Sequence, residues 1–242
     1  MTRQRADLVL VGRGLFESRA RAQEAIAAGL VRADGRVVRK PSEPLAPDAA
    51  IEAEAPWPWV SRGGVKCAAA LDAFGFDPAG RTCLDIGAST GGFTHVLLTR
   101  GAARVYAVDV GHDQLHRSLR GDPRVVSMEG RDARALIAAD FSQPPGLVVC
   151  DASFISLTLV LPPALALAAP GAELTALIKP QFEVGRTHVA KGVVRDAAAR
   201  DRACATISAM LTRLAWSIVG LVASPIAGGD GNVEFLIGAR RA

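Results

Sequence analysis

The feature that most constrains this sequence is the glycine-rich run at residues 84–93, Leu-Asp-Ile-Gly-Ala-Ser-Thr-Gly-Gly-Phe. It predicts the end of a buried strand, a tight turn and the start of a helix. Such a turn brings backbone N–H groups close to a ligand, and the helix N-terminus adds a positive dipole end. A second apolar segment, 104–109, ends in Asp109, and an acid at that place in a nucleotide crevice accepts ribose hydroxyls. For the glycines alone, an ordinary strand-to-helix turn is the simpler interpretation.

Strand and helix patterns alternate through the last three quarters of the chain. The expected strands lie at 81–86, 104–110, 125–129, 146–150, 173–178, 216–223 and 233–239. The expected helices lie at 65–74, 91–100, 112–120, 157–168 and 196–213. This alternation predicts a parallel, doubly wound sheet, and the last strand is expected to run antiparallel. The fold class is therefore α/β and Rossmann-like, with a small α+β domain before it.

The N-terminal segment carries the basic excess of the chain. Residues 1–42 hold nine Lys/Arg and four Asp/Glu, a net charge of +5 against +4 for all 242 residues. Ser18 is a good N-cap for a helix over 19–28, and the Asp-Gly pair at 34–35 predicts a hairpin between short strands. The charge favours a polyanion-binding module, with a merely solvated basic face as the alternative.

Charged residues follow several predicted strands at the edge where doubly wound sheets bind ligands. Asp151 closes the fourth strand and Lys179 the fifth, so neither is expected on a freely solvated face. Lys66 lies on the helix that leads into the sheet, and Glu234 lies in the last strand region. A neutral lysine can take a proton from a hydroxyl, and carboxylates can orient it. The alternative is four separate surface charges.

Other site types are less well supported by the sequence. The four cysteines, Cys67, Cys83, Cys150 and Cys204, form no C-x-x-C pair, which favours buried, reduced thiols in a cytoplasmic protein. His112 and His116 have helical spacing but no evident third ligand, so no metal site is expected. The longest apolar run, 157–170, contains two prolines and is too short to span a membrane.

The motifs resemble those of known families. The run from Ser18 to Val37, S-R-x-x-A-Q-x-x-I-x-x-G-x-V-x-x-x-G-x-V, resembles the S4 domain, a small RNA-binding fold. The turn at 85–92 with Asp109 resembles the S-adenosylmethionine (SAM) site of class I methyltransferases. The order Lys-Asp-Lys-Glu resembles the FtsJ-like RNA ribose 2′-O-methyltransferases. Over its whole length the chain resembles the TlyA family of rRNA methyltransferases, historically named hemolysins. The matching motifs lie at 61–66, 85–94, 105–111, 151–157, 179–183 and 191–196.

The resemblance implies an arrangement of domains and sites. It implies an S4-type domain over 1–55, a linker over 56–62 and a methyltransferase domain over 63–242. The implied catalytic residues are Lys66, Asp151, Lys179 and Glu234, with Lys179 as the base. The implied SAM-binding residues are Asp85, Gly87, Ala88, Ser89, Thr90, Gly91, Gly92, Phe93, Asp109, Val110, Asp132, Ala133 and Asp151. The implied RNA-binding residues are Arg5, Ser18, Arg19, Arg21, Gln23, Arg32 and Arg36.

The expected function is therefore SAM-dependent methylation of a ribose 2′-hydroxyl in rRNA, with rRNA or ribosomal subunits as partner. Two alternatives stay open. One is a membrane-active cytolysin, as the historical name of the family suggests. The other is a ribosome-binding factor that keeps a SAM fold without catalysis. The tryptophans of the Pro-Trp-Pro-Trp run at 56–59 are expected to pack against a domain surface.

Overall fold

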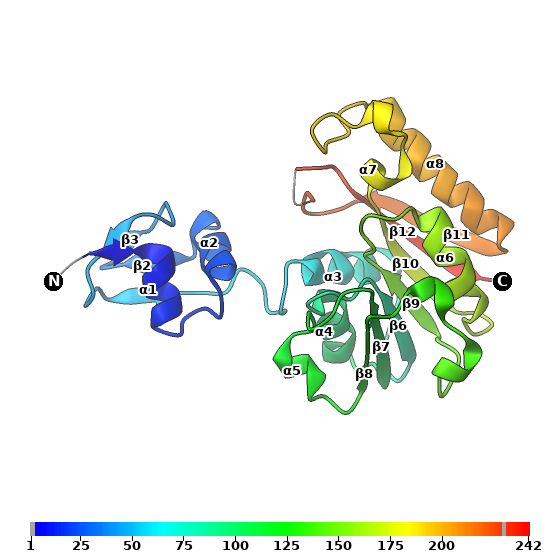
Figure 1. Ribbon diagram of the computed structural model, residues 1–242, viewed down its shortest axis with the longest axis horizontal. Coiled ribbons are helices and arrows are strands. Elements are labelled where there is room, and N and C mark those ends of the chain that lie inside the picture. Colours follow the sequence, from blue (N-terminus) through cyan, green and yellow to red (C-terminus); the bar gives the residue numbers. More distant parts are fainter. Residues whose placement is uncertain (1–2, 229–230) are drawn as a thin grey trace. The chain divides into compact units, whose positions relative to one another are not determined.

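The computed structural model describes residues 3–228 and 231–242, the side chain of Arg186 excepted. The chain divides into two compact units, with the division between Pro58 and Trp59 (Figure 1). Each unit has its own apolar core. The larger unit contains the predicted sheet, and the smaller one contains the predicted basic helix and hairpin.

The smaller unit is built from short elements around a compact core. Its helices are α1 (Ala6–Gly12) and α2 (Arg19–Ala27). One antiparallel sheet has the order β3-β2-β5, with β2 at Val31–Ala33, β3 at Arg36–Val37 and β5 at Ile51–Ala53. A second ribbon, not predicted, pairs β1 (Gln4–Arg5) with β4 (Pro44–Leu45). The helix predicted over 19–28 and the hairpin are confirmed, and the Ser18 side chain accepts a bond from the Arg21 amide at 3.3 Å as the N-cap of α2.

The larger unit contains one seven-stranded sheet in the order β11-β12-β10-β9-β6-β7-β8. The parallel strands are β6 (Thr82–Ile86), β7 (Arg104–Asp109), β8 (Val125–Glu129), β9 (Leu147–Cys150) and β10 (Glu173–Ile178). The strands β11 (Trp216–Ala223) and β12 (Phe235–Arg241) are antiparallel to each other, and β12 is antiparallel to β10. The predicted α/β class and the antiparallel last strand are both confirmed.

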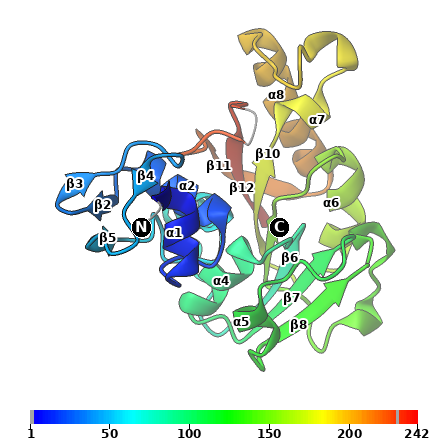
Figure 2. The same cartoon turned by 60° about the vertical axis from the view of Figure 1, so that its left-hand side comes forward.

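Helices cover both faces of this sheet, as Figures 1 and 2 show. The helices α3 (Gly63–Phe74) and α4 (Gly92–Thr99) pack on one face, and α6 (Leu157–Ala166) and α8 (Ala197–Arg213) pack on the other. The remaining elements are short: α5 (Arg117–Arg120), α7 (Pro180–Glu183), η1 (Ala133–Ala135), η2 (Ala138–Asp140) and η3 (Arg186–His188). Side chains alternate along a strand. Cys83 of β6 therefore faces the core beneath α3 and α4, whereas Leu84 and Ile86 face the core beneath α6 and α8.

One predicted helix, 112–120, is wrong over its first half. The segment after β7 forms a loop in which the carboxylate of Glu129 accepts bonds from the amides of Gln114 and Leu115, at 2.6 and 2.8 Å. Helix α5 begins only after His116, whose ring caps it. These amides bond to a side chain from β8, a tertiary contact that helical spacing could not reveal. Within the described residues, no helix is both long and apolar enough to cross a membrane.

The close contact between α3 and β12 gives a test of packing. A Cβ added at Gly238 of β12 would lie 2.4 Å from the Phe74 ring, whereas one at Gly121 would meet nothing within 4 Å. We expect Gly238→Ala to lower the free energy of unfolding by about 1–3 kcal/mol, since overpacking forces the ring to shift. Gly121→Ala should have little effect. Urea unfolding followed by the near-UV signal of buried Trp216 measures both, and equal stabilities would contradict the packing.

Candidate active site

The turn between β6 and α4 is held against the next strand of the sheet. Gly87 has φ +79°, and a Cβ there would lie 2.9 Å from the Ala152 main chain. A Cβ at Gly92 would collide with the hydroxyl of Ser61 and the main chain of Gly64. Only glycine lets the turn lie this close to its neighbours. The first two amides of the turn do not face a ligand as predicted, because those of Gly87 and Ala88 donate to the Val108 carbonyl at 2.9 and 3.1 Å. Ser61, whose hydroxyl lies against the start of α4, was given no role of its own from the sequence.

Asp109 at the end of β7 reaches back to this turn. One carboxylate oxygen accepts a bond from the Ser89 amide and the other accepts from the Gly111 amide, both at 2.8 Å. Each oxygen keeps a lone pair for a further donor. Asp109 lines a pocket of about 560 Å³ that extends from the turn to η1. An acceptor of diol hydroxyls beside a glycine turn is what the ribose of SAM requires, so the residues fit this cofactor.

Most of the other residues predicted to bind the cofactor line one of two pockets, and the rest lie behind the pocket walls. Val110, Asp132 and Ala133 line the pocket of Asp109, while Ala88, Thr90, Gly92 and Phe93 line the neighbouring pocket described below. Asp132 also caps η1 and pairs with Arg134 at 2.6 Å. Gly91, with φ +91°, packs against Leu115 and Leu119 and lines neither pocket. Its role is to start α4.

Asp85 lies beneath the turn, fully buried, and lines neither pocket. The Thr94 hydroxyl of α4 donates to one of its carboxylate oxygens at 2.6 Å, and the other oxygen has no partner among the described residues. Burial raises the pKa of this carboxyl to about 7, and the bond from Thr94 only partly opposes it. An unpartnered acceptor below the turn suits a cationic or amine-bearing ligand above it. The Thr94 contact was not predicted, because an (i, i+9) pair follows no helical or strand period.

The four charged residues predicted at the strand ends line one pocket of about 530 Å³. They form two pairs. The Lys66 amine donates to Glu234 at 2.5 Å, and both side chains are buried. The Lys179 amine lies 2.8 Å from the Asp151 carboxylate and also donates to the Ser153 hydroxyl at 2.6 Å and the Asp151 carbonyl at 3.1 Å. Ser153 is therefore a direct partner of Lys179.

The two pockets meet along a shared wall. Gly87, Ser89, Asp151, Ser153 and Phe154 line both. A ligand held by Asp109 in one pocket can therefore present its far end to the lysines in the other. Phe154 stands out because it is 90% exposed and has φ +64°. Its ring centroid lies 5.2 Å from that of Phe182. Neither aromatic residue was assigned a role from the sequence.

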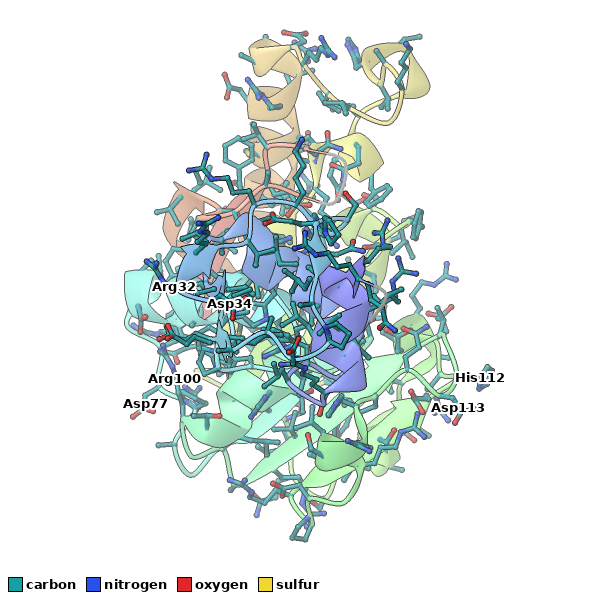
Figure 3. The ribbon with its side chains drawn as sticks, turned by 90° about the vertical axis from the view of Figure 1, so that its left-hand side faces the viewer. Arg32, Asp34, Asp77, Arg100, His112 and Asp113 are labelled. Atoms are coloured by element: carbon teal, nitrogen blue, oxygen red, sulfur yellow. The ribbon has the colours of Figure 1, made fainter. Side chains whose placement is uncertain are left out.

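The predicted RNA-binding residues of the smaller unit have varied environments. Arg5, Arg19 and Gln23 all donate to the buried carboxylate of Asp7. Arg21 donates to the Trp57 carbonyl at 3.0 Å, with its guanidinium 6.0 Å from the Trp57 ring. Arg32 and Arg36 are exposed on the hairpin, and Figure 3 labels Arg32 beside Asp34. Trp59 of the larger unit packs against the core around α3, so both linker tryptophans contact protein.

The two histidines singled out by spacing lie apart from these pockets. His112 is exposed in the loop after β7, and Figure 3 shows it projecting outward with Asp113. His116 caps α5. Among the described residues, no group of three acidic, histidine or cysteine side chains is arranged to hold a metal. All four cysteines are buried and free, and burial raises the pKa of Cys150 to about 12.

The doubly wound sheet, the glycine turn and Asp109 define a Rossmann-like, SAM-dependent methyltransferase. The chain belongs to the FtsJ-like methyltransferase family, whose model matches residues 59–241, and an S4 domain model matches residues 4–51.

Two curated relatives match nearly the whole chain. It is 47% identical to the 16S/23S rRNA (cytidine-2′-O)-methyltransferase TlyA of Mycobacterium tuberculosis, over 98% of this chain and 90% of that protein. It is 39% identical to Hemolysin A of Brachyspira hyodysenteriae, over 96% and 98%. Among solved structures, a hemolysin-named protein from Streptococcus thermophilus matches with a TM-score of 0.79 and 40% identity, covering 100% of this chain and 90% of that one.

The burial of Asp85 predicts a pH dependence of stability. Its pKa rises from an ordinary value of 3.8 to about 7 in the folded chain. The protonated form therefore favours folding, so this contribution is complete below pH ~4 and is lost as the pH rises to ~7. The slope is at most about 1.4 kcal/mol per pH unit. We expect Asp85→Asn to flatten the fall in unfolding free energy over this range. Urea unfolding at several pH values measures it, and parallel curves for the two proteins would refute the assignment.

Proposed function

We propose that this protein transfers the methyl group of SAM to a ribose 2′-hydroxyl of ribosomal RNA. The observation that carries the proposal is the convergence of Lys66, Asp151, Lys179 and Glu234 in one pocket that adjoins the glycine turn. Two lysines and two acids beside a methyl donor can orient a hydroxyl and remove its proton. The M. tuberculosis relative, by its name, methylates cytidine riboses in 16S and 23S rRNA, which supports the same reaction class here.

The cofactor end of the site would be held by the turn and Asp109. When bound, SAM supplies an activated methyl group. Asp109 would accept the ribose hydroxyls, and Asp132 and Ala133 would border the adenine end. Asp151 lines both pockets and would face the end of the ligand that carries the reactive group. In this arrangement the protein mainly fixes position, which is a large source of rate in a direct displacement.

Lys179 is the residue placed to take the proton of the ribose hydroxyl. Its amine contacts three oxygens, two from Asp151 and one from Ser153. These contacts fix the direction of the amine toward the shared wall of the pockets. Before it can accept a proton, the ammonium must release one of its own to solvent, and its neighbours decide where the remaining hydrogens point. Lys66 and Glu234 form a separate buried pair that shapes the nucleotide side of the pocket.

The smaller unit would hold the RNA through its basic face while the larger unit acts on one ribose. The basic excess of residues 1–42 and the match to the S4 domain support this division of roles. Phosphate contacts position a protein on RNA without reading its sequence. A cytoplasmic location follows from the ribosomal substrate and fits the four free cysteines. The name Hemolysin A describes a relative, and the charged pocket of this chain favours the methyltransferase.

The role of Asp109 can be tested by SAM binding alone. Asp109→Ala leaves ribose hydroxyls without an acceptor, a cost of about 1–3 kcal/mol, so SAM should bind roughly tenfold more weakly or worse. Asp113→Asn is the control, because this nearby carboxylate is exposed and lines neither pocket. Calorimetric titration with SAM measures both variants. Wild-type affinity in Asp109→Ala would reject the assignment.

The role of Lys179 can be tested by two substitutions that differ in charge. Arginine stays protonated at any working pH, so Lys179→Arg keeps the charge but cannot take the hydroxyl proton. If Lys179 is the base, Lys179→Ala and Lys179→Arg should both lose about 10²–10⁴ in methyl transfer. The measurement is single-turnover methylation of ribosomal subunits at saturating SAM, with SAM and RNA binding checked separately.

The control for this test is Lys191→Arg, at an exposed turn outside the pocket lining. It should keep the wild-type rate. A near-normal rate for Lys179→Arg would show that Lys179 supplies only positive charge, to a phosphate for example. A large loss in both variants with intact binding would support the base.

A further inference from the structure

A single buried carboxylate lies beneath the basic face of the smaller unit. Asp7, in the first turn of α1, has a relative exposure of 0%. It accepts bonds from Arg5 at 3.0 and 2.9 Å, from Arg19 at 3.3 and 3.1 Å, and from Gln23 at 2.8 Å. The two arginine side chains are 45% and 55% exposed. Asp7 therefore joins β1, α1 and α2 through their polar side chains.

Both arginines meet Asp7 with the same pair of nitrogens. Each donates through Nε and Nη2. For both, the structure gives no partner among the described residues for the remaining nitrogen, Nη1. A guanidinium is a rigid planar fork, so fixing one edge also fixes the direction of the others. The exposed edges of Arg5 and Arg19 are thus held in a defined arrangement around one carboxylate, with Arg5 bonded to both of its oxygens and Arg19 to one.

This arrangement matters because the carboxylate lowers the charge of a face that is to bind a polyanion. On charge alone, Asp7 would weaken RNA binding. An unrestrained arginine, however, loses side-chain freedom when it binds, which costs affinity. Arginines already held in place lose less. The pKa of Asp7 is held well below its ordinary value, chiefly by the bond from Arg5, so the carboxylate stays ionised through the neutral range.

We propose that Asp7 is a positioning residue for RNA binding, which holds Arg5 and Arg19 with their outer N–H donors directed at the RNA phosphate backbone. The proposal rests on the proposed function, in which this face binds RNA. It adds a comparison of two effects on RNA affinity. The gain from holding the two guanidiniums in position is larger than the loss caused by the negative charge of Asp7. The ligand chemistry is a pair of phosphate oxygens on RNA, contacted by planar donors.

The decisive variant is Asp7→Asn in the full chain, with purified ribosomal subunits as the probe. The change keeps the shape and removes one negative charge. If charge alone decides, binding should tighten. If Asp7 positions the arginines, binding should weaken by about tenfold, because two side chains then become ordered only on binding. Asp48→Asn, an exposed acid in the turn before β5, is the matched control and should not weaken binding.

A second variant tests the proposal without changing a buried residue, in case Asp7→Asn unfolds the smaller unit. Arg19→Lys keeps the charge of an exposed side chain but loses its planar fork. The proposal expects weaker binding, while charge alone predicts no change. Circular dichroism reports folding, and isothermal SAM titration, which should be unchanged, reports the larger unit. Weaker binding by folded Asp7→Asn supports the proposal, and equal or tighter binding overturns it. If Asp7→Asn does not fold, Arg19→Lys decides in the same way.

Arg19→Ala separates failure of this proposal from failure of the proposed RNA face. If Arg19→Ala binds subunits like the wild type with an unchanged salt slope, the face does not bind RNA, since each lost phosphate contact should lower that slope by about 0.7–0.9. If Arg19→Ala weakens binding but Arg19→Lys and folded Asp7→Asn bind as tightly as the wild type or more tightly, the face binds RNA and only the positioning role of Asp7 is overturned.

Discussion

The site depends on the parallel register of the central strands. Ile86 at the end of β6 pairs with Val108 on one side and with Cys150 on the other. The residues that follow, Gly87, Asp109 and Asp151, therefore leave the sheet at one level and on one edge. Strand β10 runs two residues past its last pair with β9, which carries Lys179 to the same edge. Without this register, the turn between β6 and α4 and the two Lys–acid pairs would not lie in adjoining pockets.

Burying charged side chains at this site costs desolvation free energy, and bonds between neighbouring side chains offset part of that cost. Lys66 and Glu234 are both almost fully buried and bond to each other. A buried pair of this kind is weak evidence for stability, because the desolvation of two ions can exceed their attraction. Asp85 is buried without a cation among its described partners, and its raised pKa is the result. Sites that keep such groups usually do so for function rather than for folding.

The sequence was informative where structure depends on local pattern. Strand limits came from apolar runs, and the positions of Asp109, Asp151 and Lys179 came from the ends of those runs. Contacts between distant segments were not accessible in this way. Ser153 bonds to Lys179, 26 residues away, and Thr94 bonds to Asp85 across the turn. The failed first half of the 112–120 helix has the same cause, because Glu129 from another strand binds its amides. The roles of the predicted site residues stay proposals, whereas their positions are now described.

Both units place a carboxylate beside basic side chains. In the larger unit, the Asp151 carboxylate lies 2.8 Å from the Lys179 amine, and Glu234 accepts a bond from the Lys66 amine in the same pocket. In the smaller unit, Asp7 holds two guanidiniums at a surface. In each case an acid lowers the net positive charge of a place that we propose meets RNA or its ribose. Such an acid is an electrostatic cost unless direction matters more than charge. Proton transfer and bidentate phosphate contacts both demand direction, because each works only along a narrow line between donor and acceptor.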